Sequence, residues 1–347
     1  MVWILRKIFP PYHDFEKAIS SKIILPKQGK ALFIRIDQRL GNLLLTTPTI
    51  KNLKELFPEF SIDVLTASKF QSVLSQLPFI HQVIPFQKKM FFRNLLSFFF
   101  GILELRKKEY DIVFDCSHSH IYSSTGSILT FIIGRKFRVG HFHEQAKNLY
   151  THSVFSLSES TYEIDQKNTL LSVIHGHEII PFTKKMETSL GNNPESFDYV
   201  SDFYHHTGIS NFQQKSMIGI NPGARKSLNR ASEDFYIALI KEILSQSSAK
   251  CLVFWGPDEK EMADRYEEIF CDENSRVFIA PPTDIEQLAC FLNTLAVFIT
   301  NDTGPMHVSV AKGCATFGIF IDTDSKRWGH HHHPHRCFEL QNLSEEE

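Results

Sequence analysis

Apolar and polar positions along this chain alternate in blocks that fit strands and helices in turn. From Lys30 onward, short apolar runs typical of buried strands are each followed by a longer segment typical of a helix. The predicted strands of the first half cover 31–36, 62–65, 82–84, 112–115 and 137–140. The predicted helices cover 42–56, 69–77, 91–108, 123–134 and 162–175. This alternation predicts a mostly parallel sheet with helices on both faces.

The alternation restarts after an irregular, polar middle, and we place a domain boundary within 178–215. The predicted strands of the second half cover 217–220, 251–255, 277–280, 295–299 and 315–320. The predicted helices cover 233–244, 259–270, 283–295 and 308–312. The third of these helices opens with a capping box, Thr283-Asp284-Ile285-Glu286. We therefore predict an N-terminal extension (1–29) and two doubly wound α/β domains, 30–205 and 206–347, facing a central cleft.

The stretch 300–307, Thr-Asn-Asp-Thr-Gly-Pro-Met-His, is the most informative motif. It joins a predicted strand to a predicted helix, where backbone N–H groups and the helix dipole favour an anion. Gly304 allows close approach of the backbone, and Pro305 suits a first helical turn because its missing N–H would have no partner there. The local pattern leaves two interpretations open: a phosphate-binding turn, or a tight turn with a capping Asp302 and a packed His307.

Bulk properties narrow the class of protein. A length of 347 residues suits two domains, and 37 basic against 39 acidic residues give no footprint of a nucleic-acid binder. The 6 cysteines are scattered without metal-finger spacing, which predicts reduced, buried thiols. No apolar segment is long enough to span a membrane, and the apolar part of 1–9 is too short for a secretory signal. We expect a cytosolic protein.

Polar clusters lie where predicted strands end, at 35–42, 221–226 and 302–307. The carboxyl ends of the strands are where doubly wound sheets bind ligands. The first cluster lacks the dinucleotide-binding G-x-G-x-x-G pattern, and the chain has no P-loop. These absences argue against NAD-dependent enzymes and NTPases.

Several segments, in this order along the chain, resemble bacterial glycosyltransferase family 9, the heptosyltransferase group. They are IRIDQRLGNLLLTTPTIKNLKELFP (34–58), YDIVFDC (110–116), INPGARKS (220–227), VFWGPDEKE (253–261), TNDTGPMHVSVAKG (300–313) and RWG (327–329). The resemblance implies a GT-B fold and an inverting, metal-independent transfer that uses no cofactor. It also implies that a heptose passes from an ADP-sugar to a lipopolysaccharide core or O-antigen-type acceptor at the inner face of the cytoplasmic membrane.

The resemblance implies that the second domain binds the nucleotide-sugar. Asp302 would bind sugar hydroxyls, while Thr303 and Gly304 would donate N–H groups to the diphosphate. His307, one helical turn further, would reach a phosphate oxygen; its alternative is a packed core histidine.

Gly223 and Ala224 resemble a second phosphate-facing loop. Lys226 or Arg230 would neutralise the leaving diphosphate, and the choice stays open because the family's usual K-R-W is here Asn-Arg-Ala at 229–231. The other donor-site residues taken from the resemblance are Arg225, Glu261 and Met306. Glu261, like Asp258, would accept a hydrogen bond from a ribose; the alternative for both is an acidic, solvated helix start.

Inverting transfer needs a carboxylate that takes the proton of the attacking hydroxyl. Many family members carry Gly-Asp where this chain has Gly41-Asn42, and an amide cannot accept that proton. We therefore predict Asp37 as the base, the alternative being a loop carboxylate paired with Arg35 or Arg39. Asn42 would orient an acceptor hydroxyl or cap a helix, and Arg39 and Gly41 are assigned to acceptor binding.

Two further segments carry unusual composition. Residues 90–100 are aromatic with basic flanks, and the segment 1–9 has the same character. Either they pack on the protein, or they rest on an anionic bilayer, which would make the enzyme peripheral to the membrane. The run His330–His333, with His335, predicts no native metal site, because no carboxylate or cysteine completes it with recognisable spacing.

Two other functions stay open. A catalytically weak nucleotide-sugar or glycan-binding protein is favoured by Asn42, and turnover by variants at positions 37 and 42 would distinguish it. A GT-B enzyme that uses another nucleotide-sugar would reveal itself by preferring UDP over ADP.

Overall fold

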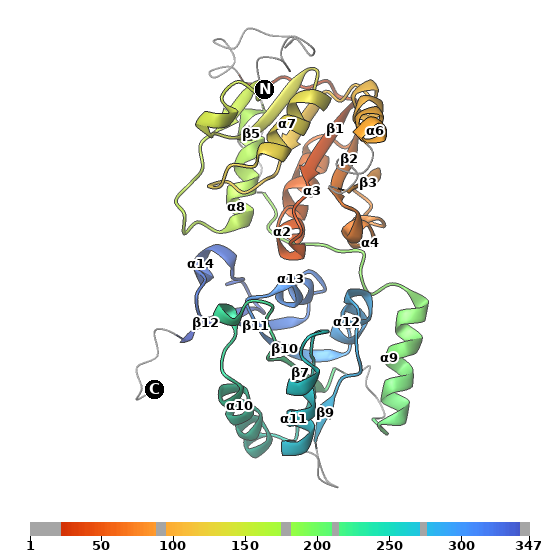
Figure 1. The fold of residues 1–347 in the computed structure, drawn as a ribbon, viewed down its shortest axis with the longest axis vertical. Coiled ribbons are helices and arrows are strands. Elements are labelled where there is room, and N and C mark those ends of the chain that lie inside the picture. Colours follow the sequence, from red (N-terminus) through yellow and green to blue (C-terminus); the bar gives the residue numbers. More distant parts are fainter. Residues whose placement is uncertain (1–21, 88–94, 175–181, 210–214, 271–275, 341–347) are drawn as a thin grey trace. The chain divides into compact units, whose positions relative to one another are not determined.

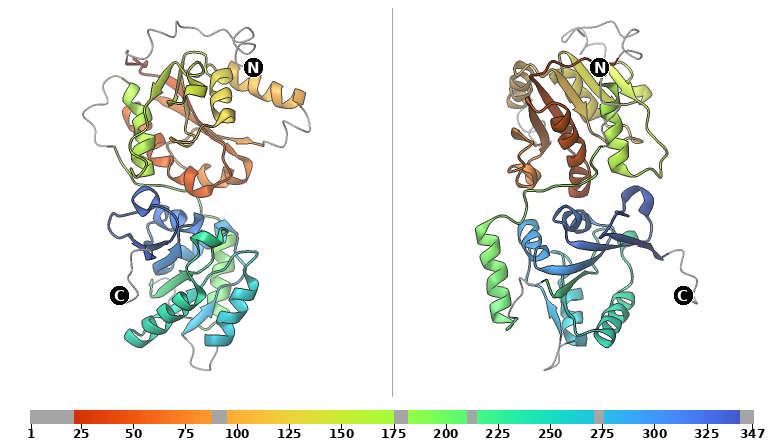
Figure 2. Two further views of the ribbon diagram at one scale, coloured as in Figure 1. Left: turned by 60° about the vertical axis from the view of Figure 1, so that its left-hand side comes forward. Right: turned by 180° about the vertical axis from the view of Figure 1, so that it is seen from behind.

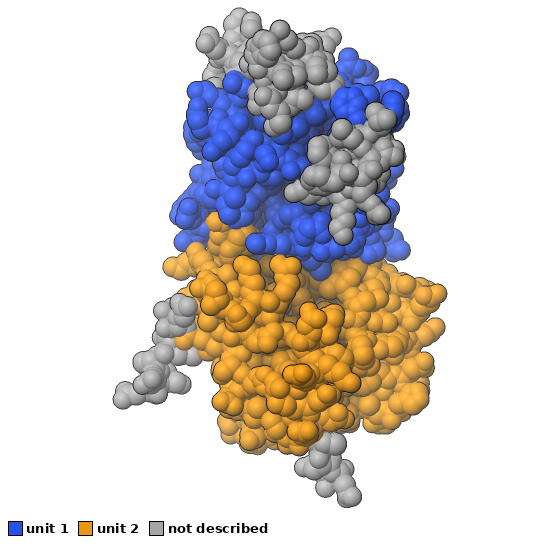
Figure 3. Space-filling view, in the orientation of Figure 1, with its two compact units in different colours: residues 1–187 blue, residues 188–347 orange. Residues whose placement is uncertain are grey.

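The computed structural model describes residues 22–87, 95–174, 182–209, 215–270 and 276–340. The chain divides into two compact units, unit 1 (Met1–Glu187) and unit 2 (Thr188–Glu347), coloured separately in Figure 3. Of the two segments for which we considered membrane contact, 1–9 and the first part of 90–100, residues 90–94, lie outside the described residues.

Unit 1 is built on a parallel sheet, which has six strands within its described residues, in the order β3-β2-β1-β4-β5-β6 (Figure 1). The strands are β1 (Gly29–Arg35), β2 (Phe60–Ala67), β3 (Gln82–Phe86), β4 (Ile112–Asp115), β5 (Phe137–His141) and β6 (His152–Val154). The strands predicted for the first half are all confirmed, and β6 is an addition. Its three residues are too few to show an apolar pattern.

The helices of unit 1 lie on either side of this sheet (Figures 1 and 2). The α-helices are α2 (Leu40–Leu44), α3 (Thr47–Leu56), α4 (Gln71–Leu74), α6 (Leu95–Lys107), α7 (Ser124–Ile133) and α8 (Glu163–Asn168). Short 3-10 helices cover Ser68–Phe70, Glu144–Ala146 and Thr169–Val173. The helix predicted over 42–56 is divided, because Pro48 lies in the first turn of α3 and cannot donate the N–H that would continue α2.

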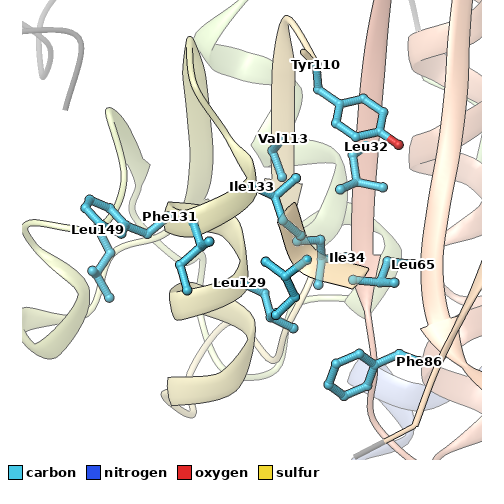
Figure 4. Packing of buried hydrophobic residues seen from close by; sticks show 12 residues of the cluster. Leu32, Ile34, Leu65, Phe86, Tyr110, Val113, Leu129, Phe131, Ile133 and Leu149 are labelled. Atoms are coloured by element: carbon cyan, nitrogen blue, oxygen red, sulfur yellow. The ribbon is translucent and has the colours of Figure 1, made fainter. Parts of the chain in front are cut away.

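The core of unit 1 packs α7 against the central strands (Figure 4). Leu32 and Ile34 of β1 meet Val113 of β4 and Ile133 of α7, and each of these side chains is fully buried. Burying one such side chain contributes about 1.5–3 kcal/mol. The apolar runs of the sequence therefore hold β1 and β4 side by side, which fixes where their polar carboxyl ends lie.

Unit 2 repeats this arrangement. Its described residues form a six-stranded parallel sheet in the order β12-β11-β10-β7-β8-β9. The strands are β7 (Met217–Asn221), β8 (Lys250–Val253), β9 (Val277–Ile279), β10 (Leu295–Asn301), β11 (Ala315–Phe320) and β12 (Arg336–Glu339). Its helices are α9 (Pro194–His206), a 3-10 helix (Ser227–Asn229), α10 (Glu233–Gln246), α11 (Lys260–Phe270), α12 (Ile285–Leu292), α13 (Gly304–Ala311) and α14 (Ser325–Trp328).

The boundary between the units falls after Glu187, earlier than the predicted boundary after 205. Helix α9 accounts for the difference, because it packs on α12 within unit 2. The Tyr204 hydroxyl lies 2.8 Å from Thr294 Oγ1, and the Phe203 ring packs edge-on against Phe291. The polar segment before α9 indicated the region of the boundary. Contacts between residues far apart in the sequence determine that α9 belongs to unit 2.

The predicted capping box is shifted by one residue. Asp284, not Thr283, is the N-cap of α12, and its carboxylate accepts the Gln287 N–H at 2.8 Å. Gln287 Oε1 in turn accepts the Asp284 N–H at 2.9 Å, which completes the box. Glu286 is thereby free of a capping role and accepts the N–H of Gly191 at 2.8 Å instead.

Within the described parts of the chain, no helix has the length and apolarity that crossing a membrane requires. Helix α6 nevertheless exposes Phe99 and Phe100, at 42% and 63% of their surfaces, on a helix that ends with Arg106 and Lys107.

Candidate functional site

Both sheets change winding direction next to their first strand. In unit 1, β1 lies between β2 and β4; in unit 2, β7 lies between β8 and β10. The loops that leave two such neighbouring strands diverge to opposite faces of the sheet, and this switch point is where doubly wound folds bind ligands. Arg35 and Asp115 end the strands at the switch point of unit 1, and Asn221 and Asn301 end them in unit 2.

In unit 2, Asp302 and Thr303 follow β10 directly and lead into α13. Thr303 is the N-cap of α13 and Pro305 lies in its first turn, so the helix begins earlier than the predicted 308. The Asp302 N–H donates to the Ile319 carbonyl at 3.0 Å, and Asp302 Oδ2 accepts the Thr323 hydroxyl at 2.7 Å. The start of α13 is therefore held against β11, with the Asp302 carboxylate fixed beside it.

His307 lies one turn into α13 and is buried. Its Nε2 is 4.0 Å from Asp302 Oδ1, and its Nδ1 is 2.9 Å from Nε2 of His330. Burial lowers the pKa of His307, with Asp302 acting in the opposite direction, so the ring is neutral at pH 7. A neutral imidazole can donate a hydrogen bond from one nitrogen and accept at the other.

Met306 contributes packing. Its buried side chain packs on β11, where its sulfur lies against Gly318. Its N–H donates to the Thr303 carbonyl at 3.1 Å. A Cβ at position 318 would lie 2.7 Å from that sulfur, so glycine is needed for this close fit.

Asn301 holds the other loop of unit 2, although we did not predict it as a site residue. Its buried Nδ2 donates to the carbonyls of Pro222 and Gly223 at 2.8 and 3.2 Å, and its Oδ1 accepts the Ala231 N–H at 3.1 Å. One side chain therefore closes both ends of the loop 222–231 onto the end of β10. The signal in the sequence was the amide directly before Asp302, at a position that completes a buried strand.

Glu259, between the predicted Asp258 and Glu261, is a second residue that we missed. Its Oε2 accepts the Gly256 N–H at 2.7 Å, and its Oε1 lies 3.0 Å from Nη2 of Arg230. A Cβ on Gly223 would lie 2.0 Å from Glu259 Oε2, so this carboxylate packs directly on the Gly223 backbone. The pair of glycines that it touches was the signal in the sequence.

Arg230 and Lys226 differ in their surroundings. Arg230 Nη2 donates to the Ala224 carbonyl at 2.7 Å and pairs with Glu259, so this guanidinium braces the loop. Lys226 is exposed, as are Arg225 and Glu261. Within the described residues, no hydrogen bond or ion pair engages the Lys226 side chain.

In unit 1, Asp37 lies directly beyond β1 and contacts two of the residues considered with it. Its Oδ2 accepts hydrogen bonds from Arg35 Nη2 at 3.0 Å and from Asn42 Nδ2 at 2.5 Å. Its Oδ1 is buried and has no hydrogen-bond partner in the described part of the chain. Arg35 also donates to the Cys116 carbonyl, which ties the loop after β1 to the loop after β4.

Arg39 and Gly41 flank the start of α2. Arg39 occupies the N-cap position, and its side chain is exposed. Gly41 is buried in the first turn, and Asn42 follows it with 8% of its surface exposed. Asn42 is not the N-cap, and its amide is directed to the Asp37 carboxylate instead.

A buried ionic group lies under the loop after β4. Lys167 Nζ is 3.0 Å from Glu163 Oε1 and donates to the Ser117 carbonyl at 2.5 Å, and both side chains are fully buried. Burial lowers the pKa of Lys167, and Glu163 opposes that effect. Beside it, the Tyr150 hydroxyl donates to Asp115 Oδ2 at 2.7 Å. No pattern in the sequence indicated this group, because Glu163 and Lys167 fit the polar face of a helix.

His141, which ends β5, predicts a specific acid sensitivity. It is buried, its Nε2 bonds the Gln166 carbonyl at 3.0 Å, and burial beside Lys167 lowers its pKa from 6.5 to about 3. Below pH 6.5 the unfolded ring takes up a proton that the folded ring does not, so stability is fully present above pH 6.5 and falls as the pH drops toward 3.

As the pH falls from 6 to 5, the unfolding free energy of the wild type should decrease. We expect the unfolding free energy of His141→Gln to decrease less steeply, by about 1.4 kcal/mol per pH unit. Urea unfolding at several pH values measures this. The exposed His205 of α9 provides the matched control His205→Gln, which should leave the slope unchanged. Equal slopes for wild type and His141→Gln would contradict the prediction.

Each unit holds a Rossmann-like parallel sheet with a braced polar loop at its switch point, and the chain has the α/β GT-B fold of the similar solved structures described below. The model of glycosyltransferase family 9 (heptosyltransferase) matches residues 102–347, and the chain belongs to this family.

Three relatives illustrate the likeness. Lipopolysaccharide heptosyltransferase 3 of Escherichia coli is 23% identical over 296 residues, 83% of this chain and 82% of that protein. The crystal structure of a family 9 glycosyl transferase from Veillonella parvula has a TM-score of 0.76 and 21% identity, covering 90% of this chain and 86% of that one. E. coli heptosyltransferase WaaC with ADP has a TM-score of 0.67 and 16% identity, covering 89% and 93%.

Proposed function

We propose that this glycosyltransferase moves a heptose, or a closely related sugar, from an ADP-sugar to a lipopolysaccharide core or O-antigen-type acceptor. Transfer inverts the anomeric centre and needs no metal ion. The observation that carries the proposal is the braced pair of loops in unit 2, where Asn301 joins 222–231 to the start of α13. Support comes from the relative named lipopolysaccharide heptosyltransferase 3 and from the similar structure with ADP.

Unit 2 binds the donor in this proposal. The N–H groups of Thr303 and Gly304, at the N-terminus of α13, face the diphosphate, as do Gly223 and Ala224 of the other loop. Asp302 accepts hydrogen bonds from sugar hydroxyls. Its position is prepared by the Thr323 hydroxyl, so little ordering remains to be done on binding.

The charges of the donor loop divide between two roles. Lys226, exposed on the loop, neutralises the leaving diphosphate, and Arg225 adds positive charge beside it. Arg230 acts through the loop, which it holds by its bonds to Ala224 and Glu259. Glu261, at the exposed start of α11, accepts a hydrogen bond from the ribose.

Unit 1 binds the acceptor, with Asp37 as the general base. Arg35 and Asn42 occupy Asp37 Oδ2, so the proton goes to Oδ1. An acceptor hydroxyl that displaces the atoms shielding Oδ1 would give this oxygen the hydrogen bond that it lacks within the described residues. Arg39 and the Gly41 turn border the same loop and contact the acceptor.

The acceptor that we propose is linked to a lipid, and peripheral contact with the inner face of the cytoplasmic membrane follows from it. The exposed Phe99 and Phe100 of α6, a helix that ends with Arg106 and Lys107, support this placement, because aromatic and basic side chains together favour an anionic bilayer surface.

Donor binding is tested by calorimetry with ADP, UDP, GDP, dTDP and ADP-heptose in the absence of divalent metal. We expect ADP to bind in preference to the other nucleoside diphosphates. We expect Asp302→Ala to weaken ADP-heptose binding about tenfold or more, because charged hydrogen bonds to the sugar are lost, and to change ADP binding less.

The exposed Asp198 of α9 gives the matched control, Asp198→Ala, which should bind both ligands as the wild type does. A preference for UDP would assign the protein to another sugar class within the same fold. Absence of binding by every nucleotide would remove the proposed donor site.

A further inference from the structure

The histidine run of this chain divides between the interior and the surface of unit 2. His330 and His335 are buried, whereas His331, His332 and His333 are exposed. The run follows α14 and leads into β12, which pairs with β11 at the edge of the sheet (Figure 1). It is therefore an integral part of the domain.

His330 contacts His307 of the candidate donor site. Its Nε2 lies 2.9 Å from Nδ1 of His307, and the two rings meet at 83°. The His330 N–H is held 3.1 Å from Cys337 Sγ, so β12 fixes the backbone that carries this ring. The ring of His330 also packs edge-on against those of His332 and His335.

His307 and His330 are joined by one hydrogen bond, and a single proton lies between the two nitrogens that form it. Burial holds the pKa of His330 well below its usual value, and His307 lowers it further, so neither ring is cationic at pH 7. One nitrogen of the pair therefore donates and the other accepts. The choice decides which nitrogen of His307 carries its own proton, because the partner of one ring nitrogen sets the tautomer of the ring.

The position of the Asp302 carboxylate indicates which of the two histidines donates this hydrogen bond. Its Oδ1 lies 4.0 Å from Nε2 of His307, and a lone pair on that nitrogen would face a negative oxygen. A proton on Nε2 removes this repulsion and supplies a donor toward the carboxylate. Nδ1 of His307 is then the acceptor, and Nε2 of His330 is the donor.

We propose that His330 is a positioning residue of the donor site: it donates its Nε2–H to His307 Nδ1 and so holds His307 in the tautomer that presents Nε2–H. Nδ1 of His330 consequently carries no proton. This inference rests on the proposed function, in which unit 2 binds the donor diphosphate, and it adds that the Nε2–H of His307 serves that diphosphate. The tautomer itself is a property of the free protein, and it can be measured without a ligand.

The test combines a tautomer measurement with donor binding. Protein labelled with ¹⁵N-histidine reports protonated and unprotonated ring nitrogens, and the spectrum of His307→Gln identifies the His307 signals. In the wild type we expect His307 with Nε2 protonated and Nδ1 bare. In His330→Ala we expect this preference to disappear and ADP-heptose affinity to fall about tenfold.

Two variants separate positioning from mere structural support. The side-chain amide of His330→Gln can place an N–H near the position of Nε2, and we expect it to restore both the His307 tautomer and affinity to within about threefold of wild type. His333→Ala removes an exposed ring of the same run and should change neither property.

A proton on Nδ1 of His307 in the wild type would overturn the inference, whatever the variants do. So would a His330→Ala protein that keeps both the tautomer and the affinity. If the wild type shows the expected tautomer and binds no nucleotide-sugar, the proposed function fails while the tautomer assignment stands.

Discussion

Replacing Asp37 by asparagine should lower the turnover number about 100- to 10,000-fold, the usual cost of losing a general base. The substitution keeps the size of the side chain and its hydrogen bonds to Arg35 can partly re-form, but the amide cannot take a proton from the acceptor hydroxyl. Turnover is measured with ADP-heptose and truncated lipopolysaccharide. ADP-heptose affinity, measured by calorimetry, should stay unchanged because the donor binds to unit 2.

Position 42 supplies the decisive control. Asn42→Asp would place a second carboxylate where the amide now lies 2.5 Å from Asp37 Oδ2. Two carboxylates at that distance share one proton, so the pair carries a single negative charge, as Asp37 alone does in the wild type. We therefore expect turnover not to rise. A large gain in Asn42→Asp, or full activity in Asp37→Asn, would show that Asp37 is not the base.

The contact between Asp37 and Asn42 also bears on what could be predicted from the sequence. The two residues are five positions apart, and the sequence placed both at the end of the first strand. It left open whether Asp37 is a base or a carboxylate paired with Arg35. The structure contains that ion pair together with a buried Oδ1 that has no hydrogen-bond partner among the described residues, so both features occur in one side chain.

The alternation of apolar runs was sufficient to predict two doubly wound sheets, because each parallel strand is buried on both faces and leaves a continuous apolar signal. It did not predict β6 or the start of α13, and it located the boundary only to the region 178–215, within which the units divide after Glu187. These features depend on contacts such as Tyr204 with Thr294, which join residues ninety positions apart and leave no local pattern. The predicted arrangement of the two domains around a central cleft stays a prediction.

The residues that face the ligand in our proposal were easier to predict than the residues that hold them. Asp302 and Gly223 lie in turns with recognisable composition, whereas Asn301 and Glu259 act through hydrogen bonds to backbone groups that the sequence cannot place. We predicted no native metal site in the histidine run, because nothing completes it with recognisable spacing. Its contact with His307 depends on β12 returning beside β11, which is a property of the whole sheet.

Removing Lys167 should have the largest effect on stability. Lys167→Met leaves the fully buried Glu163 carboxylate without its cation and the Ser117 carbonyl without its donor, and we expect a loss of about 3–5 kcal/mol in unfolding free energy. Chemical denaturation measures the loss. Because Ser117 adjoins Cys116, whose carbonyl Arg35 holds, we expect the loop beside Asp37 to loosen and acceptor affinity to fall as well.

The double variant Glu163→Leu/Lys167→Met tests the physical reason. If the cost arises from a buried, uncompensated charge, removing both charges should restore most of the stability, since buried ion pairs often contribute little beyond their own desolvation. The two single variants and the double variant then form a cycle with a large coupling energy. Additive losses would mean that each side chain stabilises unit 1 on its own, through packing and backbone bonds, and that the ion pair is incidental.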